Sequence, residues 1–389
     1  MARVVVLGGG FAGVEAAIYL CKQNIEVTLV SDRDYFYIYP TSIWIPTGEV
    51  TKEDVSVPLD KLAMKHGFKL IVDPVETFDA RSKKVTLKSG RILEDYSYVV
   101  LALGQDKLVH EGIEHTLSIC GKPEEAVALY EKLDALISKG SGKIAMGFGA
   151  NPQDSSAVRG GPAFEVLFNV HNYLKKKKVR KNFELTFFAP MEKPGQKMGD
   201  KALVMMDKMF KMLDIKKQVG VKISAFVEDG IVFEDETKIV SDLTMFISAG
   251  TGHSILKNAG LPLSDAGFVQ TNEYNEVEGF DGVYAIGDSA SLMGPEWRAK
   301  QGHVAEVMAK NVAYNINAHM QGIDSKYSYM EHLNILCVLD TGDGAAFVYR
   351  SNKSAKMIPM PIVGHWMKKM WGWYCRHSKL GRIPRIPGM

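Results

Sequence analysis

Apolar and polar positions along the chain form blocks that predict strands and helices in turn. At the N-terminus, ARVVVLGGGFAGVEAAIYLCKQ has the pattern of a buried strand, a glycine turn and a helix, and IEVTLVSDRDYF follows as a second strand. Further apolar runs typical of strands are SYVVLALG, KIAMGFG, FELTFFAP and GVYAIGDSASL. Helical spacing is seen in PEEAVALYEKLDALISK, GPAFEVLFNVHNYLKKKK and KQGHVAEVMAKNVAYNINAHM.

This alternation predicts an α/β fold with parallel sheets. Two strand–glycine-turn units, one at the N-terminus and one at KIAMGFG, indicate two Rossmann-like domains. We expect the first domain to be discontinuous, with residues 1–110 and 265–330, and the second to span residues 111–264. Residues 331–389 form a separate C-terminal region that contains an amphipathic helical segment.

Composition narrows the class of protein. Hydrophobic residues make up 46% of the 389 residues and charged residues 24%, which is typical of a globular protein, and the net charge of +2 gives no reason to expect nucleic acid. The four cysteines, at positions 21, 120, 337 and 375, lie far apart and form no CxxC, so we expect neither a metal site nor disulfides. No run of about 20 apolar residues is present. The first strand begins at Arg3, so we expect no signal peptide.

The first candidate for chemistry is the GGGFAG turn. Its glycines Gly8, Gly10 and Gly13 flank Phe11 and Ala12 and follow directly on a strand. Glycines in this position let the backbone approach a pyrophosphate at a helix N-terminus. Asp32 lies 19 positions after the last glycine, where a carboxylate would hold a ribose hydroxyl. The alternative is a tight turn without a ligand.

The C-terminal segment HWMKKMWGWYCRHSKLGR, from His365, can be drawn as a helix at 100° per residue. One face then carries Trp366, Met367, Met370, Trp371, Trp373 and Tyr374, and the other carries Lys368, Lys369, Arg376 and Lys379. Aromatic side chains opposite cations are typical of a helix that lies in a membrane interface. The alternative is a helix docked on its own domain or on a second subunit.

Two later segments extend the cofactor assignment. The run VYAIGDSA, with Gly287 and Asp288, together with the N-terminal loop resembles the second FAD motif of flavoproteins with two dinucleotide-binding domains. The strand end VVLALG, with Ala102 and Gly104, resembles a third motif of these proteins. The resemblance implies FAD, with Asp288 near its ribityl-phosphate region.

The second glycine loop, GFGANP, departs from the nucleotide-binding pattern, because Pro152 stands where a third glycine would be. In this respect the chain resembles sulfide:quinone oxidoreductases and the related flavocytochrome c sulfide dehydrogenases. The segment Gly161 to Glu165 reads GPAFE, as their GPA-[YF]-E does, and SDRDYFYIYP resembles a stretch that adds Ser31, Arg33 and Pro40 to the cofactor site. The resemblance implies a cavity for inorganic sulfur beside the flavin rather than a site for NADH.

The cysteines limit this resemblance. Members of the family use two redox cysteines, and Cys337 matches the second, whereas Arg159 or a neighbour stands at the first. Cys120 resembles a third cysteine with a supporting role. A single thiolate at Cys337 would still attack a sulfur donor. The alternative for both cysteines is a small buried apolar residue.

Two charged residues are further candidates. Glu165 acts as a general base if its pocket raises its pKa, or else is an ordinary carboxylate at a helix start. Lys300 places positive charge near the flavin, or else is solvated. No cysteine lies in the segment from Tyr35 to Glu49, where flavocytochrome c relatives attach their cofactor, so we expect noncovalent FAD.

The resemblance predicts an FAD-dependent enzyme, and the expected lack of a leader favours the cytoplasmic face of a membrane. It would pass electrons from sulfide or polysulfide to a quinone, and would contact the membrane surface through its C-terminal helix. A homo-oligomer is possible. The alternatives are a type II NADH:quinone dehydrogenase and a catalytically altered FAD-binding paralogue that serves as a subunit or sensor.

Overall fold

A computed structural model describes residues 3–386 of the chain. Its first sheet has five parallel strands in the order β19-β9-β1-β2-β5. These strands are β1 (Arg3–Leu7), β2 (Glu26–Ser31), β5 (Lys69–Val72), β9 (Tyr98–Leu101) and β19 (Val283–Ala285). The central strands are short unbroken apolar runs because helices or loops cover both faces of the sheet.

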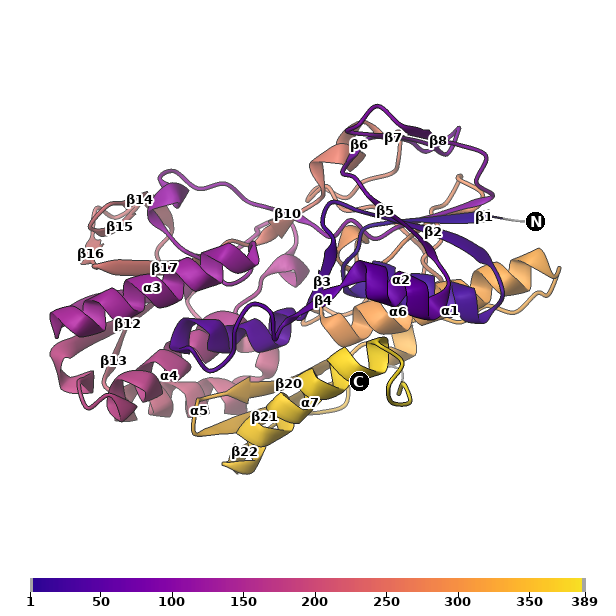
Figure 1. Ribbon diagram of the computed structural model, residues 1–389. Helices are drawn as coiled ribbons and strands as arrows, with labels where there is room; N and C mark the ends of the chain where they lie inside the picture. Colours follow the sequence, from indigo (N-terminus) through magenta and orange to yellow (C-terminus); the bar gives the residue numbers. More distant parts are fainter. Residues whose placement is uncertain (1–2, 387–389) are drawn as a thin grey trace.

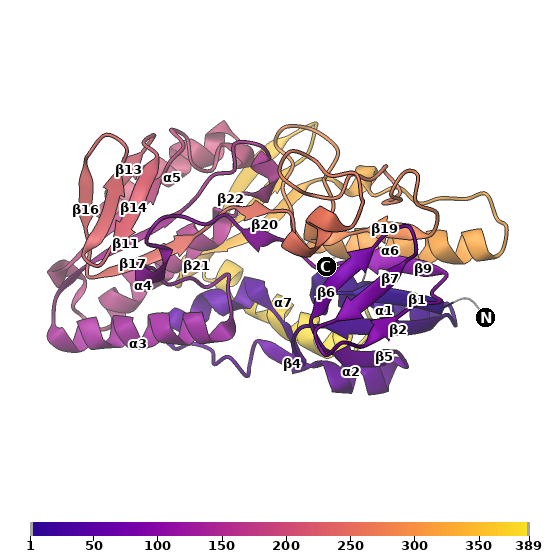
Figure 2. The same cartoon turned by 90° about the horizontal axis from the view of Figure 1, so that it is seen from above.

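A second parallel sheet has four strands in the order β13-β12-β11-β17. Its strands are β11 (Gly142–Phe148), β12 (Phe183–Ala189), β13 (Ile215–Val219) and β17 (Leu243–Ile247). The two sheets form the cores of two lobes that lie side by side (Figures 1 and 2). The predicted α/β fold with two Rossmann-like units is therefore confirmed, while the residue boundaries of the domains stay predictions.

The helices pack around these sheets. They are α1 (Phe11–Lys22), α2 (Leu59–His66), α3 (Pro123–Lys139), α4 (Gly161–Lys176), α5 (Asp200–Met212), α6 (Gly302–Met320) and α7 (Val363–Lys379). The helices α1 and α6 pack closely together beside the first sheet. Because α1 is buried along most of its length, its sequence is apolar on nearly every face.

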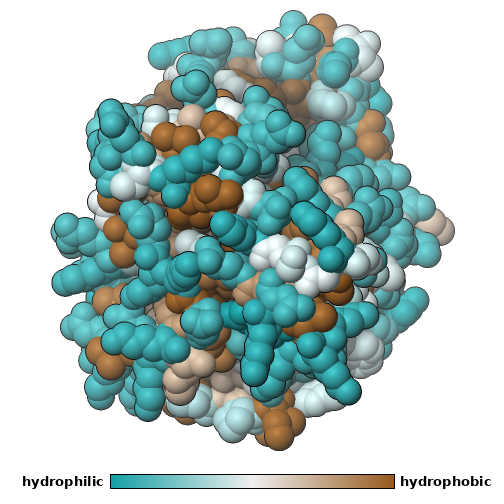
Figure 3. Space-filling model, turned by 90° about the vertical axis from the view of Figure 1, so that its left-hand side faces the viewer, coloured by the Kyte–Doolittle hydropathy of each residue, from teal (hydrophilic) through white to brown (hydrophobic). Residues whose placement is uncertain are grey.

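Short antiparallel sheets surround this framework. They are β3 (Tyr35–Tyr37) with β4 (Ser56–Pro58); β6 (Val75–Asp79), β7 (Lys84–Leu87) and β8 (Ile92–Leu93); β10 (Asp106–Lys107) with β18 (Gly250–Thr251); and β14 (Ile223–Val227), β15 (Gly230–Phe233) and β16 (Lys238–Val240). The β10–β18 pair lies where the chain passes between the two lobes (Figure 1). The end of the second lobe is mostly hydrophilic, with apolar side chains in small groups (Figure 3).

The C-terminal region is more than the helical segment expected from the sequence. Three antiparallel strands, β20 (Ile335–Asp340), β21 (Gly344–Arg350) and β22 (Ala355–Pro361), precede α7. The helix then runs beneath both lobes toward α1 and α6 (Figure 1). Among residues 3–386, no helix is long and apolar enough to cross a membrane.

Candidate functional site

The first glycine loop is a tight turn with one open side. A Cβ atom at Gly8 would lie 2.1 Å from the Ala102 carbonyl oxygen, and one at Gly13 would lie 1.8 Å from the Gly8 carbonyl oxygen. The position of Gly10 is different, because nothing lies within 4 Å of a Cβ placed there. Gly10 is also the N-cap of α1 and offers no side chain to the free N–H groups of the first turn. This arrangement fits a pyrophosphate on the helix N-terminus.

The other predicted cofactor residues gather at the same edge of the first sheet. Ser31 is buried at the end of β2, and Asp32 follows it on the surface. The Arg33 Nε atom is buried without a hydrogen-bond partner, while its Nη1 donates to the Tyr39 hydroxyl at 3.4 Å. Pro40 follows Tyr39 in a 3-10 helix, and Phe11 and Ala12 begin α1. The unpaired Arg33 nitrogen is a donor available to a bound nucleotide.

The late glycine motif meets this edge as well. Gly287 adopts a φ of +61°, and a Cβ there would lie 2.8 Å from the Ala12 Cβ atom. The Gly104 amide donates to the Ser289 hydroxyl at 2.9 Å, which ties the third motif to the second. The three motifs therefore meet at one edge of the sheet, although 280 positions separate Gly8 from Asp288 along the chain.

Asp288 and Lys300 lie together with Arg159. The Arg159 guanidinium pairs with the Asp288 carboxylate, and the Lys300 ammonium donates to the Asp288 carbonyl oxygen at 3.0 Å. Lys300 is buried, so the solvated-lysine alternative is wrong, and burial lowers its pKa to about 7. Cys120 lies beside Arg159; burial raises the pKa of its thiol, which the Arg159 charge opposes.

The second glycine loop is not a phosphate cradle. After β1, α1 begins at once, whereas residues 149–160 separate β11 from α4. This loop is closed by its own hydrogen bonds: Asn151 Oδ1 accepts from the Gln153 and Asp154 amides at 2.9 and 3.3 Å. A Cβ at Gly160 would lie 2.6 Å from the ring of Phe148, so an aromatic side chain fills the space. The second unit thus lacks the direct strand-to-helix turn of the first, although a Cβ at Gly161, the first residue of α4, would meet nothing within 4 Å.

Cys337, on β20, faces a buried ion pair. The Glu165 carboxylate on α4 pairs with the Lys368 ammonium on α7, and it accepts from the Asp340 amide at 2.8 Å. Burial raises the pKa of Glu165, and Lys368 opposes this shift. Burial, and then the Glu165 charge, raise the pKa of Cys337 to about 12. Glu165 is therefore no ordinary helix-start carboxylate, and Cys337 is a protonated thiol at neutral pH.

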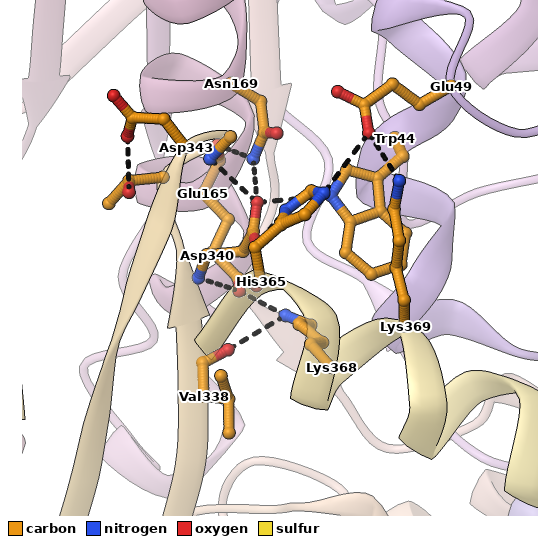
Figure 4. Close-up of polar contacts among 12 residues, drawn as sticks. Trp44, Glu49, Glu165, Asn169, Val338, Asp340, Asp343, His365, Lys368 and Lys369 are labelled. Carbon is orange, nitrogen blue, oxygen red and sulfur yellow. Dashed lines mark hydrogen bonds and ion pairs between the residues drawn. The ribbon is translucent and has the colours of Figure 1, made fainter. Parts of the chain in front are cut away.

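Sequence reasoning missed the network next to this pair (Figure 4). The Asp340 carboxylate is completely buried. Its Oδ1 atom accepts hydrogen bonds from Trp44 Nε1 at 3.1 Å, Asn169 Nδ2 at 3.0 Å and the Gly342 amide at 2.9 Å. Its Oδ2 atom lies 2.7 Å from His365 Nδ1. Burial alone would raise the pKa of Asp340, but His365 and the other donors hold it below its ordinary value. The network joins β20 to α4, α7 and the 3-10 helix at Trp44.

An open pocket of about 540 Å³ lies on the outer side of His365. Its lining includes Glu49, whose carboxylate lies 2.9 Å from Lys369 Nζ and 3.6 Å from His365 Nε2. Trp366 and Ile362 line the same pocket and are exposed. Polar groups thus lie at its base and apolar side chains at its rim.

The two faces of α7 correct one part of the sequence interpretation. Trp366, Met367, Met370 and Trp373 are exposed, as expected of the apolar face. Lys368 and Lys379, which were assigned to the polar face, are buried instead. Their ammonium groups pair with carboxylates inside the protein, at Glu165 for Lys368 and at Glu15 and Glu306 for Lys379. The apolar face therefore points outward, and the two lysines attach the helix to the protein.

Comparison with known proteins agrees with this geometry. A family model described as pyridine nucleotide-disulphide oxidoreductase matches residues 2–322. The chain belongs to this family. It is 30% identical over 368 residues to the sulfide-quinone reductase of Aquifex aeolicus, with 89% of this chain and 83% of that protein covered. The solved structure of the sulfide:quinone oxidoreductase from Aquifex aeolicus matches with a TM-score of 0.87 at 25% identity, covering 98% of this chain and 92% of that one.

The predicted resemblance to sulfide:quinone oxidoreductases is thus confirmed. A second relative is the type II NADH:quinone oxidoreductase of Staphylococcus saprophyticus, which is 24% identical over 373 residues, with 89% of this chain and 90% of that protein covered. One of these relatives is named for sulfide and the other for NADH. The electron donor of this oxidoreductase must therefore be inferred from the residues of its own site.

Proposed function

We propose that this oxidoreductase binds FAD noncovalently and passes electrons from sulfide or polysulfide to a membrane quinone. The observation that carries the proposal is the closed second loop. Phe148 crowds Gly160, and α4 starts only at Gly161, so the second unit lacks the direct strand-to-helix turn that holds a dinucleotide phosphate, which supports a donor other than NADH. The relatives named for sulfide and quinone support the same choice of donor and acceptor.

FAD, when bound, supplies two-electron transfer between the sulfur compound and the quinone. The residues of the chain supply the rest. Cys337 is the candidate thiol that meets the sulfur donor. Joining its sulfur to that of sulfide as a persulfide releases two electrons and two protons; FAD, when bound, would take up the electrons, and a base must take the thiol proton because burial raises the pKa of Cys337 to about 12. Glu165 is the candidate base, since its charge acts on Cys337 and burial raises its pKa, which makes the carboxylate a better proton acceptor.

The two cysteine candidates do not lie in the same surroundings. Cys120 lies beside Arg159, and Cys337 beside Glu165 and Lys368. All four cysteines are free thiols. Because Arg159 or a neighbour stands where the first redox cysteine of the family would be, we propose a route through one thiol rather than through a protein disulfide.

We further propose that α7 lies on the membrane surface on the cytoplasmic side. Its outward face is apolar and adjoins the open pocket beside His365, so a quinone in the bilayer would reach the protein at this end. The inward lysines keep the helix attached to both lobes while the apolar face is in lipid.

Anaerobic rapid mixing tests the choice of donor. We expect purified protein to show a flavin spectrum that sulfide or polysulfide bleaches far faster than NADH at the same micromolar concentration. Comparable bleaching by NADH would favour the type II dehydrogenase. A flavin that neither compound reduces would favour the altered paralogue, for which the replacement of a redox cysteine near Arg159 is the supporting observation.

A further inference from the structure

A buried cluster of charged side chains joins the end of α7 to the start of α1. The Lys379 ammonium lies 2.9 Å from Glu15 Oε2 and 2.6 Å from Glu306 Oε1. The Arg385 guanidinium pairs with the other oxygen of Glu15. The side chains of Lys379 and Glu15 are only 2% and 1% exposed. Nothing in the proposed reaction uses these groups.

The cluster lies directly behind the first glycine loop. Glu15 is the second residue after Gly13 and belongs to the first turns of α1. The Lys379 ammonium also lies 5.6 Å from the centre of the Phe11 ring, and Phe11 is the residue that follows Gly10 in the loop. The ring of Phe36, in β3, completes the enclosure at 5.2 Å. Lys379 thus contacts both a side chain of the loop and the helix that the loop begins.

Further contacts hold the same end of α7 on the first lobe. The Arg376 guanidinium donates to the carbonyl oxygens of Glu53, Asp54 and Ser56 at 2.9, 2.8 and 3.0 Å. The end of α7 is therefore a packed part of the first lobe. Nearer the middle of α7, a Cβ at Gly372 would lie 2.5 Å from the Cγ2 atom of Thr41, in the 3-10 helix that packs against α3 and α4, so this close approach is to the other lobe.

The charges in the cluster depend on one another. Burial would raise the pKa of Glu15, but Lys379 and Arg385 hold it below its ordinary value. Burial also raises the pKa of Glu306, with Lys379 opposing the shift. Without Lys379, two buried carboxylates would share one remaining cation, which is a strongly unfavourable arrangement in an apolar interior. Two responses can relieve this arrangement: protonation of Glu306, whose pKa burial already raises, or movement of α1 or α6. Movement of α1 would disturb the glycine loop, because α1 begins at that loop.

We infer that the C-terminal helix completes the FAD site, with Lys379 as a positioning residue that holds the first turn of α1 and Phe11 in the geometry that receives the pyrophosphate. The inference rests on the proposed FAD site. Binding of FAD and docking of α7 are then coupled, and by linkage each must strengthen the other.

The experiment compares FAD affinity in matched variants. Apoprotein is titrated with FAD by fluorescence at a temperature well below the melting temperature of every variant. We expect Lys379→Met to weaken FAD binding about tenfold or more, within the range usual for coupled sites, and Lys379→Arg to weaken it much less. The control is Lys216→Met, which breaks the exposed pair of Lys216 with Glu184 (2.6 Å) in the second lobe and should leave the affinity unchanged.

A second variant separates positioning from stability. Lys379→Met/Glu306→Gln leaves Glu15 paired with Arg385 and so removes the unbalanced charge, and we expect it to recover melting temperature. FAD binding should stay weak, because the ammonium that contacts both Glu15 and the Phe11 ring is still absent. If the double variant also recovers full FAD affinity, or if Lys379→Met lowers only the melting temperature, the cluster is a stability element and the inference is wrong. Wild-type protein that binds no FAD would overturn both the inference and the proposed function.

The effect of bound FAD on the docking of α7 gives a second test. A cluster that only stabilised the fold would not make the protection of α7 by FAD depend on Lys379. Trypsin cleaves after lysine and arginine, and α7 contains several of these residues. We expect saturating FAD to slow cleavage within α7 in the wild type but not in Lys379→Met/Glu306→Gln. Equal protection of both proteins by FAD would contradict the coupling.

Discussion

The apolar face of α7 is open to a direct test by the double substitution Trp366→Ser/Met370→Ser. These residues lie one helical turn apart and are 61% and 67% exposed, so neither contributes much to the folded core. Deleting the helix would be a poor test, because it would also remove Lys368 and Lys379. Their carboxylate partners would then be buried without a cation, and the loss of membrane binding could not be told from unfolding.

The magnitude follows from the exposed surface. Full burial of a large apolar side chain is worth about 1.5–3 kcal/mol, so moving the exposed part of these two side chains into lipid gains about 3 kcal/mol in total. A loss of about 3 kcal/mol lowers a partition coefficient by about two orders of magnitude. Because Lys368 and Lys379 point inward, salt should weaken binding only slightly.

Sedimentation with phospholipid vesicles measures this partition coefficient. The matched control is Val109→Ser/Val240→Ser, which removes exposed apolar side chains, 87% and 47% exposed, outside the C-terminal region. We expect the control to bind vesicles as the wild type does and the α7 variant to remain in the supernatant. Equal sedimentation of all three proteins would refute the membrane assignment. A wild-type dimer that the α7 variant dissociates would show instead that a second subunit covers this face.

Three further results are expected. Cys337→Ser should abolish sulfide-dependent flavin reduction in a stopped-flow assay and leave the flavin spectrum intact, because a serine hydroxyl stays protonated and is a poor nucleophile. The control Cys21→Ser should react normally. Full activity of Cys337→Ser would contradict the single-thiol route. A pKa of about 12 leaves about one Cys337 thiol in ten thousand ionised at pH 8. Iodoacetamide should therefore alkylate Cys337 about a thousandfold more slowly in folded than in unfolded protein, and about tenfold faster for each unit of rising pH, as measured by mass spectrometry. Alkylation at the unfolded rate would disprove the raised pKa. Gly10→Val should fold, since its Cβ meets nothing within 4 Å, but should be colourless because the side chain enters the pyrophosphate space; a yellow Gly10→Val protein would place the cofactor elsewhere.

The sequence was sufficient where local patterns dominate. The strand–turn–helix at GGGFAG and the late GD turn have fixed spacings, and a parallel sheet brings such turns to one edge, so their convergence could be predicted without a structure. The absence of an open second loop was also visible, because Pro152 replaces a glycine.

The sequence was insufficient where distant residues pair. Lys368 and Lys379 look like solvent-facing cations, and nothing nearby in the chain reveals that their partners are Glu165, Glu15 and Glu306. One signal was present: Glu15 and Glu306 are lone carboxylates within apolar helices, and such residues are seldom buried without a partner. The partner itself could be identified only from the packing of α7 against α1 and α6.

The helix periodicity of α7 and the exposure of its apolar face were predicted correctly, but the burial of Lys368 and Lys379 was not. Trp366 and Lys368 were placed on different faces, as the structure has them. Amphipathicity alone assigns the charged face to water, whereas here buried carboxylates on α1, α4 and α6 attract the lysines inward. The strands β20 to β22, which carry Cys337 and Asp340, were likewise not predicted.

The most direct test of the central claim is quinol formation by the vesicle-bound protein under anaerobic conditions. Oxidation of one sulfide to zero-valent sulfur releases two electrons, and reduction of one quinone takes up two. With a short-tail ubiquinone as acceptor, the account predicts about one quinol for each sulfide consumed, no comparable rate with NADH, and loss of the sulfide rate in Cys337→Ser. Quinol formation driven by NADH as fast as by sulfide, or no quinol formation with sulfide at all, would contradict it.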